Sequence, residues 1–212
     1  MNVQDVITRV KRQFGDESGV QVTDQDIIRW INDAQSEIAQ AQDILEVSAT
    51  SLSVANQGAY PVPSDIIYLR SVYYNGFKVR VVSLQDYDIY VNNYQEDPEN
   101  PLSGIPEIFY MWADEIKFYP VPAEAGQDIK LYYTQFPANV TSSAGQLTIP
   151  LPYHTRVVEY CLQQAYELDE NFDASNLKGQ QLSNNLTAMA EDQSWTEHTH
   201  YPSVTVLPED AW

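Results

Sequence analysis

Two histidines, His198 and His200, are the residues whose spacing points most directly to chemistry. Separated by one threonine, their imidazoles would share one face of an extended strand and could bind a transition metal once a third ligand is supplied. The surrounding segment offers no cysteine, and no carboxylate at a spacing typical of metal ligands. We therefore expect a solvated segment here and no metal site.

Acidic side chains could supply the general acid and base of a small hydrolase. The candidates lie in the middle of the chain: Asp97, Glu99, Glu107, Asp114 and Glu115. Nothing in the sequence pairs any two of them, and acids are abundant throughout, so acidic loops are the better interpretation. Cys161 lies on the apolar stripe of a predicted helix, which indicates a buried structural thiol. Because the sequence also lacks phosphate-binding loops and nucleophile elbows, we expect no catalytic residue, no metal and no cofactor.

The charge balance limits the possible partners. Acids outnumber bases 30 to 11 among 212 residues, and the formal charge is −19. Such a charge repels phosphates, so we do not expect the chain to cling to nucleic acid. Three interpretations stay open: an acidic surface that keeps the protein soluble, the lining of a passage through which DNA slides, and a docking surface for a basic partner.

Cellular location is indicated by the cysteine count and by the apolar runs. Cys161 is the single cysteine and cannot form an internal disulfide, which suits a cytosolic or virion protein. Residues 1–14 lack the apolar core of a signal peptide. No apolar run approaches about 18 residues, so we expect no transmembrane helix.

Helical periodicity marks both ends of the chain. Apolar residues at helical spacing predict a helix over 3–14 that ends at Gly15. A second helix should begin at Thr23, where Asp26 completes a capping box, and we expect the two to form an αα-hairpin. Trp30 lies off the stripe of this second helix, so it either packs on the first helix or faces a neighbouring molecule. Two further helices are predicted near 153–168 and from about 173 to 189.

From Glu46 the apolar period changes to two, which predicts a block of short strands. Asn75-Gly76 stands between the strand-like runs 66–74 and 77–82, and an Asn-Gly pair in this position predicts a tight hairpin. A second hairpin is predicted over 108–119, with its turn at Ala113-Asp114. Further strands are expected over 46–54, 59–62, 128–135 and 147–149, and a short capped helix over 83–94. Because the hairpins are local, the sheet should be antiparallel.

These patterns predict an α+β fold with three parts. Residues 1–45 and 150–190 should form a helical bundle from both chain ends, and residues 46–149 an inserted antiparallel β domain. Residues 191–212 contain Pro202 and Pro208, show no helical period and carry no Lys or Arg, so we expect an extended C-terminal tail.

Two features suggest contacts with other molecules. Lys78 and Arg80 should project the same way from one strand and could contact a partner's acids, although a solvated strand face explains them equally well. The tail carries large apolar groups that are costly to leave in water, and we expect docking on another molecule, with a strand added to a sheet edge as one route. The tail anchors would be Trp195, Tyr201, Val206 and Trp212.

Tyrosine is abundant, at 15 residues, and is concentrated in the strand block. Tyrosines of this kind serve β-sheet cores, protein interfaces and carbohydrate-binding faces. A glycan- or receptor-binding module is therefore an alternative to a purely structural role.

Four segments, taken in order, resemble one known family. They are VTDQDIIRWINDAQSEIA (22–39), YPVPSDIIYLRSVYYNG (60–76), GIPEIFYMWADEIKFYPVPAEAGQDIKLYYTQFP (104–137) and LTIPLPYHTRVVEYCLQQAYELDEN (147–171). Together they resemble the head-to-tail connector adaptors of tailed bacteriophages, especially short-tailed ones. Val62-Pro63 stands where the family has Leu-Pro, a change that keeps the turn. The segment after Glu191 matches no motif of the family.

The resemblance implies a non-enzymatic virion protein made in the host cytoplasm. Such adaptors form a ring, commonly of twelve copies, beneath the portal protein. The ring extends the DNA channel for retention and ejection of the genome, without specific DNA binding or a membrane, and the tail tube or nozzle docks on it. The family picture also implies that the helical bundle contacts neighbours around the ring, that the strand block faces the tail, and that the C-terminal segment grips the portal or a neighbour.

Overall fold

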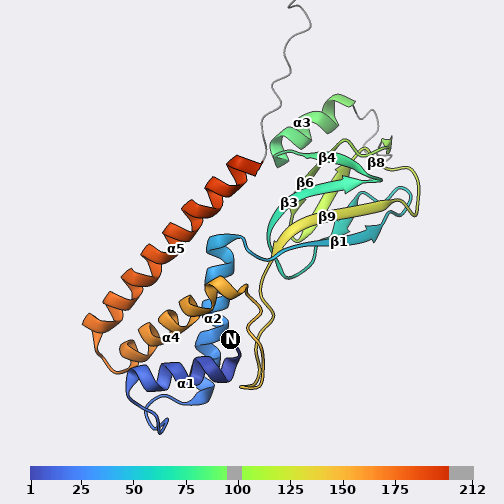
Figure 1. Cartoon of the computed structure of the whole chain (residues 1–212). Coiled ribbons are helices and arrows are strands. Elements are labelled where there is room, and N and C mark those ends of the chain that lie inside the picture. Colours follow the sequence, from blue (N-terminus) through green and yellow to red (C-terminus); the bar gives the residue numbers. More distant parts are fainter. Residues whose placement is uncertain (95–101, 201–212) are drawn as a thin grey trace, which may run out of the picture. The chain divides into compact units, whose positions relative to one another are not determined.

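The computed structural model describes residues 1–94 and 102–200, with side chains placed over 1–91 and 102–191. The fold is mixed α+β, as the sequence predicts, and Figure 1 shows helices and a curled sheet. The chain divides into two compact units. The helical unit contains Met1–Gln42 and the chain from Pro137 onward, and the β unit contains Asp43–Phe136.

The helical unit contains four α-helices and one short 3-10 helix among its described residues. They are α1 (Val3–Phe14), α2 (Asp24–Gln42), η1 (Leu151–Tyr153), α4 (His154–Leu168) and α5 (Phe172–His200). The predicted helix ends are confirmed at two places. Gly15 closes α1 with φ +94°, a conformation that glycine adopts without steric cost. The Thr23 hydroxyl accepts a hydrogen bond from the Asp26 N–H at 3.2 Å at the start of α2.

Helix α4 packs against α1, α2 and α5. Their shared core includes Ile7, Ile31, Val157 and Leu162, each at most 2% exposed. Trp30 is only 6% exposed and belongs to this core, so it is not a surface residue. The alternative that Trp30 faces a neighbouring molecule is therefore not supported, because burial of the indole within its own unit removes the contact area such a role needs.

Residues 137–149 belong to the helical unit, although their spacing suggests part of the strand block. Two side-chain amides of α2 hold this segment. The Asn32 amide donates to the Val140 carbonyl at 3.0 Å and accepts from the Val140 N–H at 2.7 Å. The Gln35 carbonyl oxygen accepts from the Thr148 N–H at 2.7 Å. These bonds take the place of sheet pairing, so the expected strand over 147–149 is absent, and only an isolated bridge joins Gln146 to Asn2.

Helix α5 corrects the prediction for the C-terminal part of the chain. The helix continues to His200, so no extended segment begins at residue 191. The reason is local, because residues 190–200 contain neither glycine nor proline and Pro202 is the first residue that cannot continue a helix. Trp195, His198 and His200 therefore lie on a helix and not on the extended segment that the sequence predicts.

The β unit contains nine strands and one helix among its described residues. They are β1 (Glu46–Leu52), β2 (Ala59–Pro61), β3 (Ile66–Tyr74), β4 (Phe77–Val81), α3 (Leu84–Tyr94), β5 (Ser103–Gly104), β6 (Ile108–Trp112), β7 (Glu115–Tyr119), β8 (Val121–Pro122) and β9 (Asp128–Gln135). Seven of the strands form one sheet in the order β1-β9-β3-β4-β6-β7-β2, and β5 pairs with β8. Both predicted hairpins, β3–β4 and β6–β7, are confirmed.

The sheet is not wholly antiparallel, which corrects the prediction. Strands β4 and β6 pair in parallel, with Arg80 opposite Ile108 and Val81 opposite Phe109. A parallel pair needs a long crossover, and the connection through α3 and β5 supplies one. Local hairpin signals carry no information about such a pairing. The inner face of the curled sheet holds a core of ten buried apolar residues, including Val72, Val79 and Phe109.

We predict that Asn32→Ala lowers the free energy of unfolding by about 1–3 kcal/mol, because it leaves both backbone groups of Val140 without a partner. Val140 is only 6% exposed, so water cannot readily replace the lost bonds. Gln40→Ala, at an exposed position of the same helix, is the matched control and should change the free energy by less than about 0.5 kcal/mol. Urea denaturation followed by circular dichroism measures both, and equal effects of the two substitutions would contradict the assignment.

Candidate docking groove

The tight turn at Asn75-Gly76 positions the basic residues that the sequence singles out. Asn75 and Gly76 have φ of +47° and +83°, as a two-residue hairpin of this type requires. The turn sets Val79 opposite Val72 and Lys78 opposite Tyr73. Val79 is then buried in the sheet core, whereas Lys78 and Arg80 are both exposed. The sequence predicts that Lys78 and Arg80 project the same way from the strand. The burial of Val79 between them is consistent with this prediction.

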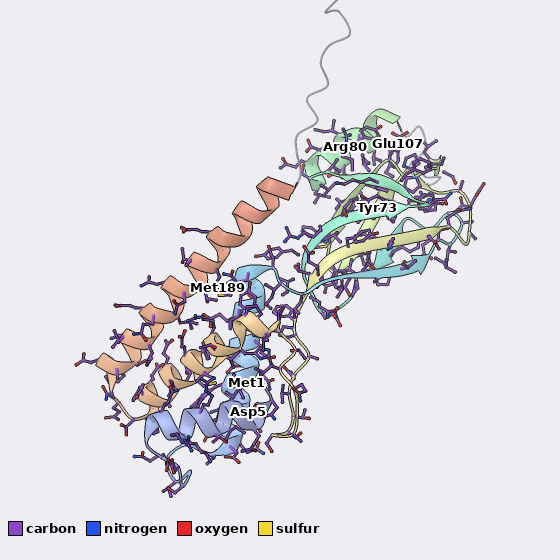
Figure 2. The ribbon with its side chains drawn as sticks, viewed as in Figure 1. Met1, Asp5, Tyr73, Arg80, Glu107 and Met189 are labelled. Carbon is purple, nitrogen blue, oxygen red and sulfur yellow. The ribbon has the colours of Figure 1, made fainter. Side chains whose placement is uncertain are left out.

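Strand β4 is too short to pair with the whole of β3. β3 has nine residues and β4 has five, and only Val72–Tyr74 pair with β4. β4 then pairs with β6, and the Arg80 N–H donates to the Glu107 carbonyl at 3.1 Å. Figure 2 labels these two residues in the β unit. As a result, residues 66–71 of β3 pair with β9 on one side and, among the described residues, with no strand on the other.

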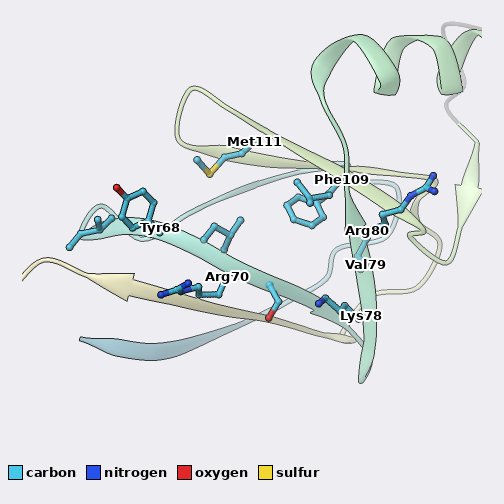
Figure 3. A pocket seen from close by; sticks show the side chains of 11 residues that line it. Tyr68, Arg70, Lys78, Val79, Arg80, Phe109 and Met111 are labelled. Atoms are coloured by element: carbon cyan, nitrogen blue, oxygen red, sulfur yellow. The ribbon is translucent and has the colours of Figure 1, made fainter. Parts of the chain in front are cut away.

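A groove of about 620 Å³ lies where β3 and β4 separate. Figure 3 shows Tyr68 and Arg70 of β3 on one side, with Phe109 and Met111 of β6 opposite. The eleven lining residues are Ile67, Tyr68, Leu69, Arg70, Ser71, Lys78, Val79, Arg80, Val81, Phe109 and Met111. Its volume falls within the range of pockets that bind ligands, about 300–1,000 Å³.

The groove is basic in a strongly acidic protein. Three of the chain's 11 bases line it, and none of its 30 acids does. Arg70 forms an ion pair with Asp43 at 2.9 Å. Lys78 and Arg80 form no ion pair with any residue that the structure describes, so their charges are available to a partner.

Large apolar side chains surround the groove and remain exposed to solvent. Val81 is 67% exposed, Tyr68 53% and Met111 49%. Contiguous exposed apolar surface of this kind is typical of interaction sites. Together with the cations, these residues make the groove a surface suited to an apolar segment that carries negative charge.

Among the described side chains, five of the chain's 15 tyrosines are buried in the interior of the β unit. Tyr74, Tyr119 and Tyr133 are at most 6% exposed. Tyr87 of α3 packs on Tyr110 with ring centroids 4.3 Å apart, and burial raises the pKa of the Tyr87 hydroxyl to about 12. These contacts anchor α3 on strands β6 and β7. These tyrosines therefore serve packing within the β unit, whereas Tyr68 and Tyr132 remain exposed.

The candidate catalytic acids do not converge within the described residues. Glu107 precedes β6 and accepts a hydrogen bond from the Tyr90 hydroxyl at 3.0 Å, whereas Asp114 lies beyond the other end of the same strand. Asp97 and Glu99 lie outside the described residues. Burial raises the pKa of the Cys161 thiol, which is fully enclosed, and so disfavours the reactive thiolate.

Two further features of the described residues bear on function. Nowhere in them do three or more His, Cys, Asp or Glu side chains gather so that they could hold a metal ion. No described helix combines the length and the hydropathy needed to cross a membrane. The side chains of Trp195, His198 and His200, and all of Tyr201, Val206 and Trp212, lie outside the part of the chain for which side chains are described.

The groove itself could not be recognised from the sequence. The hairpin signal identifies β3 and β4 but says nothing of β6, which supplies the opposite wall. The one available signal is the difference in strand length, nine residues against five, which leaves part of β3 without a hairpin partner.

We predict opposite effects of two substitutions in the hairpin turns. Gly76→Ala should lower the free energy of unfolding by about 1 kcal/mol, because a side chain is costly at positive φ. No atom lies within 4 Å of the added Cβ, so the cost comes from the backbone alone. Ala113→Gly should raise the free energy by up to about 1 kcal/mol, because Ala113 has φ +50°. Urea denaturation tests both, and changes of the same sign would refute the explanation.

Comparison with known proteins adds the family. The family model described as SU10 adaptor protein matches residues 1–205. No curated protein matches the sequence. The family match spans the helical unit, the β unit and the groove between β3 and β6. The chain therefore belongs to the SU10 adaptor protein family, and it is a structural adaptor protein of a bacteriophage virion.

Proposed function

We propose that this chain assembles, in about twelve copies as the resemblance implies, into a ring between the portal and the tail tube or nozzle of a short-tailed phage. The ring extends the DNA channel for retention and ejection of the genome. The observation that carries the proposal is the family match over residues 1–205, which covers both units of the chain. A closed ring uses a heterologous interface, in which a surface of one copy contacts a different surface of the next.

The charge of the chain supports a role beside moving DNA. A formal charge of −19 disfavours the phosphate neutralisation on which non-specific DNA binding depends. On the helical unit, Asp33 and Glu37 lie one turn apart and line a shallow acidic hollow with Tyr160. An acidic surface of this kind would let the duplex pass without being retained by contacts.

The exposed apolar surface of the β unit supports assembly with other proteins. Val81, Met111 and Trp112 are each about half exposed or more, which is unfavourable for a protein that stays alone in solution. We propose that partner proteins of the virion cover this surface. We also propose that the protein is not an enzyme, since the described acids are dispersed and Cys161 is enclosed.

We predict that the chain, mixed with portal rings from the same phage, forms a second ring of stoichiometric copies stacked on the portal. Native mass spectrometry gives the copy number and negative-stain imaging the position. Trp112→Ser should reduce ring formation, because it removes an indole that is 59% exposed on the β unit. Val20→Ser, at a site 82% exposed on the helical unit, is the matched control and should assemble as the unchanged chain does.

A chain that leaves the portal rings unchanged would refute the adaptor proposal. The glycan-binding alternative gives a different result in a separate experiment, a sugar-dependent change in tyrosine or tryptophan fluorescence without portal binding. Because the two outcomes are independent, one does not mask the other.

A further inference from the structure

We propose that the groove between β3 and β6 receives, as a missing strand, residues 203–207 of a second copy of this chain. The proposal rests on the ring assembly proposed above and names the surface through which one copy holds the next. It assigns the acceptor to the β3–β6 groove and the donor to the segment SVTVL, with the acids that follow it.

The two walls of the groove are strand edges of suitable direction. β3 runs antiparallel to β4 and β4 parallel to β6, so β3 and β6 run in opposite directions. Residues 66–71 of β3 lack a partner on this side among the described strands, and so do Tyr110–Trp112 of β6 beyond the short pairing with β4. Unpaired strand edges are templates for another strand, and an added segment would satisfy their N–H and C=O groups.

The donor segment has the length and pattern of such a strand. Pro202 and Pro208 bracket five residues, 203–207, and proline is compatible with the ends of an added strand but not with its centre. Five extended residues span about 17 Å, close to the roughly 20 Å of unpaired edge at residues 66–71. Val204 and Val206 alternate with Ser203 and Thr205, so two β-branched apolar side chains would face the groove wall together.

Charge favours the same pairing. Glu209 and Asp210 follow the donor segment, and the chain carries no Lys or Arg after Lys178. The acceptor groove presents Lys78 and Arg80 without ion-pair partners among the described residues, and its lining contains no acid. Most of this protein's surface would repel an acidic segment, so the groove is a favourable site for it.

Donor and acceptor are different parts of the chain, so the contact is heterologous and suits a ring. Each copy would insert its segment into one neighbour and receive a segment from the other, and rotation would close the circle. A strand inserted in this way contributes main-chain hydrogen bonds as well as apolar burial, which would hold the ring together after the copies meet.

Cysteine pairing between different copies tests the inference. Full-length Met111→Cys and Val206→Cys chains are purified separately, mixed, and assembled alone and on portal rings. A short bismaleimide reagent then joins nearby thiols. We expect a covalent dimer of the two variants, since neither chain carries both introduced thiols. Val20→Cys mixed with Val206→Cys is the matched control, and the unchanged chain gives the background, because Cys161 is fully enclosed.

A charge exchange tests the electrostatic part. Lys78→Glu with Arg80→Glu in the acceptor should reduce the dimer yield by about tenfold. Glu209→Lys with Asp210→Lys in the donor should restore most of the yield. Loss of yield without restoration would indicate a damaged acceptor, and equal yields throughout would refute a role for these charges.

The outcomes separate this inference from the adaptor proposal. If rings form on the portal but the dimer yield does not exceed that of the Val20→Cys control, the groove assignment is overturned. The adaptor proposal is unaffected by this result. A covalent dimer of the two variants without rings on the portal supports the groove assignment and refutes the adaptor proposal. A third chain carries Met111→Cys and Val206→Cys together, and a bond that forms only within this chain assigns the groove to the chain's own segment. A bond from Met111→Cys to the portal assigns it to the portal, and either result overturns the second-copy proposal.

Discussion

The register set by the Asn75-Gly76 turn is the constraint on which the β unit depends. Because side chains alternate along a strand, a shift of one residue would bring Lys78 or Arg80 to the sheet core and expel Val79. The same turn determines where β4 begins, and its five residues determine where β3 loses its partner. The core, the exposed cations and the open edge of β3 therefore all follow from one two-residue connection.

The groove exists because β4 leaves β3 and pairs in parallel with β6. If β4 continued along β3 as a full hairpin, the edge at residues 66–71 would be closed and the cations would lie on an ordinary sheet face. Instead β4 pairs with β6 through Arg80 and Val81 only, and the sheet opens beyond that point. A sheet edge left open in this way is a liability in a solitary protein. In a protein built for assembly, the same edge is a place where a partner can be held.

The helix caps and hairpins could be predicted from the sequence because their causes lie within a few residues. Thr23 with Asp26, and Asn75 with Gly76, need no distant partner. The assignment of residues 137–149 could not be predicted, because it depends on Asn32 and Gln35, more than a hundred residues earlier. The parallel pairing of β4 with β6, and the groove wall that β6 forms, could not be predicted for the same reason. Burial of Trp30, off the main stripe of its helix, likewise depends on how the other helices pack.

In the proposed ring, the adaptor would have to satisfy two electrostatic demands that conflict on a uniform surface. Beside DNA it should repel phosphate, and against its neighbours it should attract. The sequence meets the first demand with 30 acids, and the structure gathers three of 11 bases in one groove of the β unit. Because screening limits the reach of exposed charge to about 8–10 Å at physiological salt, a small basic site can act locally without changing the sign of the whole surface. In the proposed ring, local concentration of the few bases would let one acidic chain repel the genome while it binds neighbouring copies.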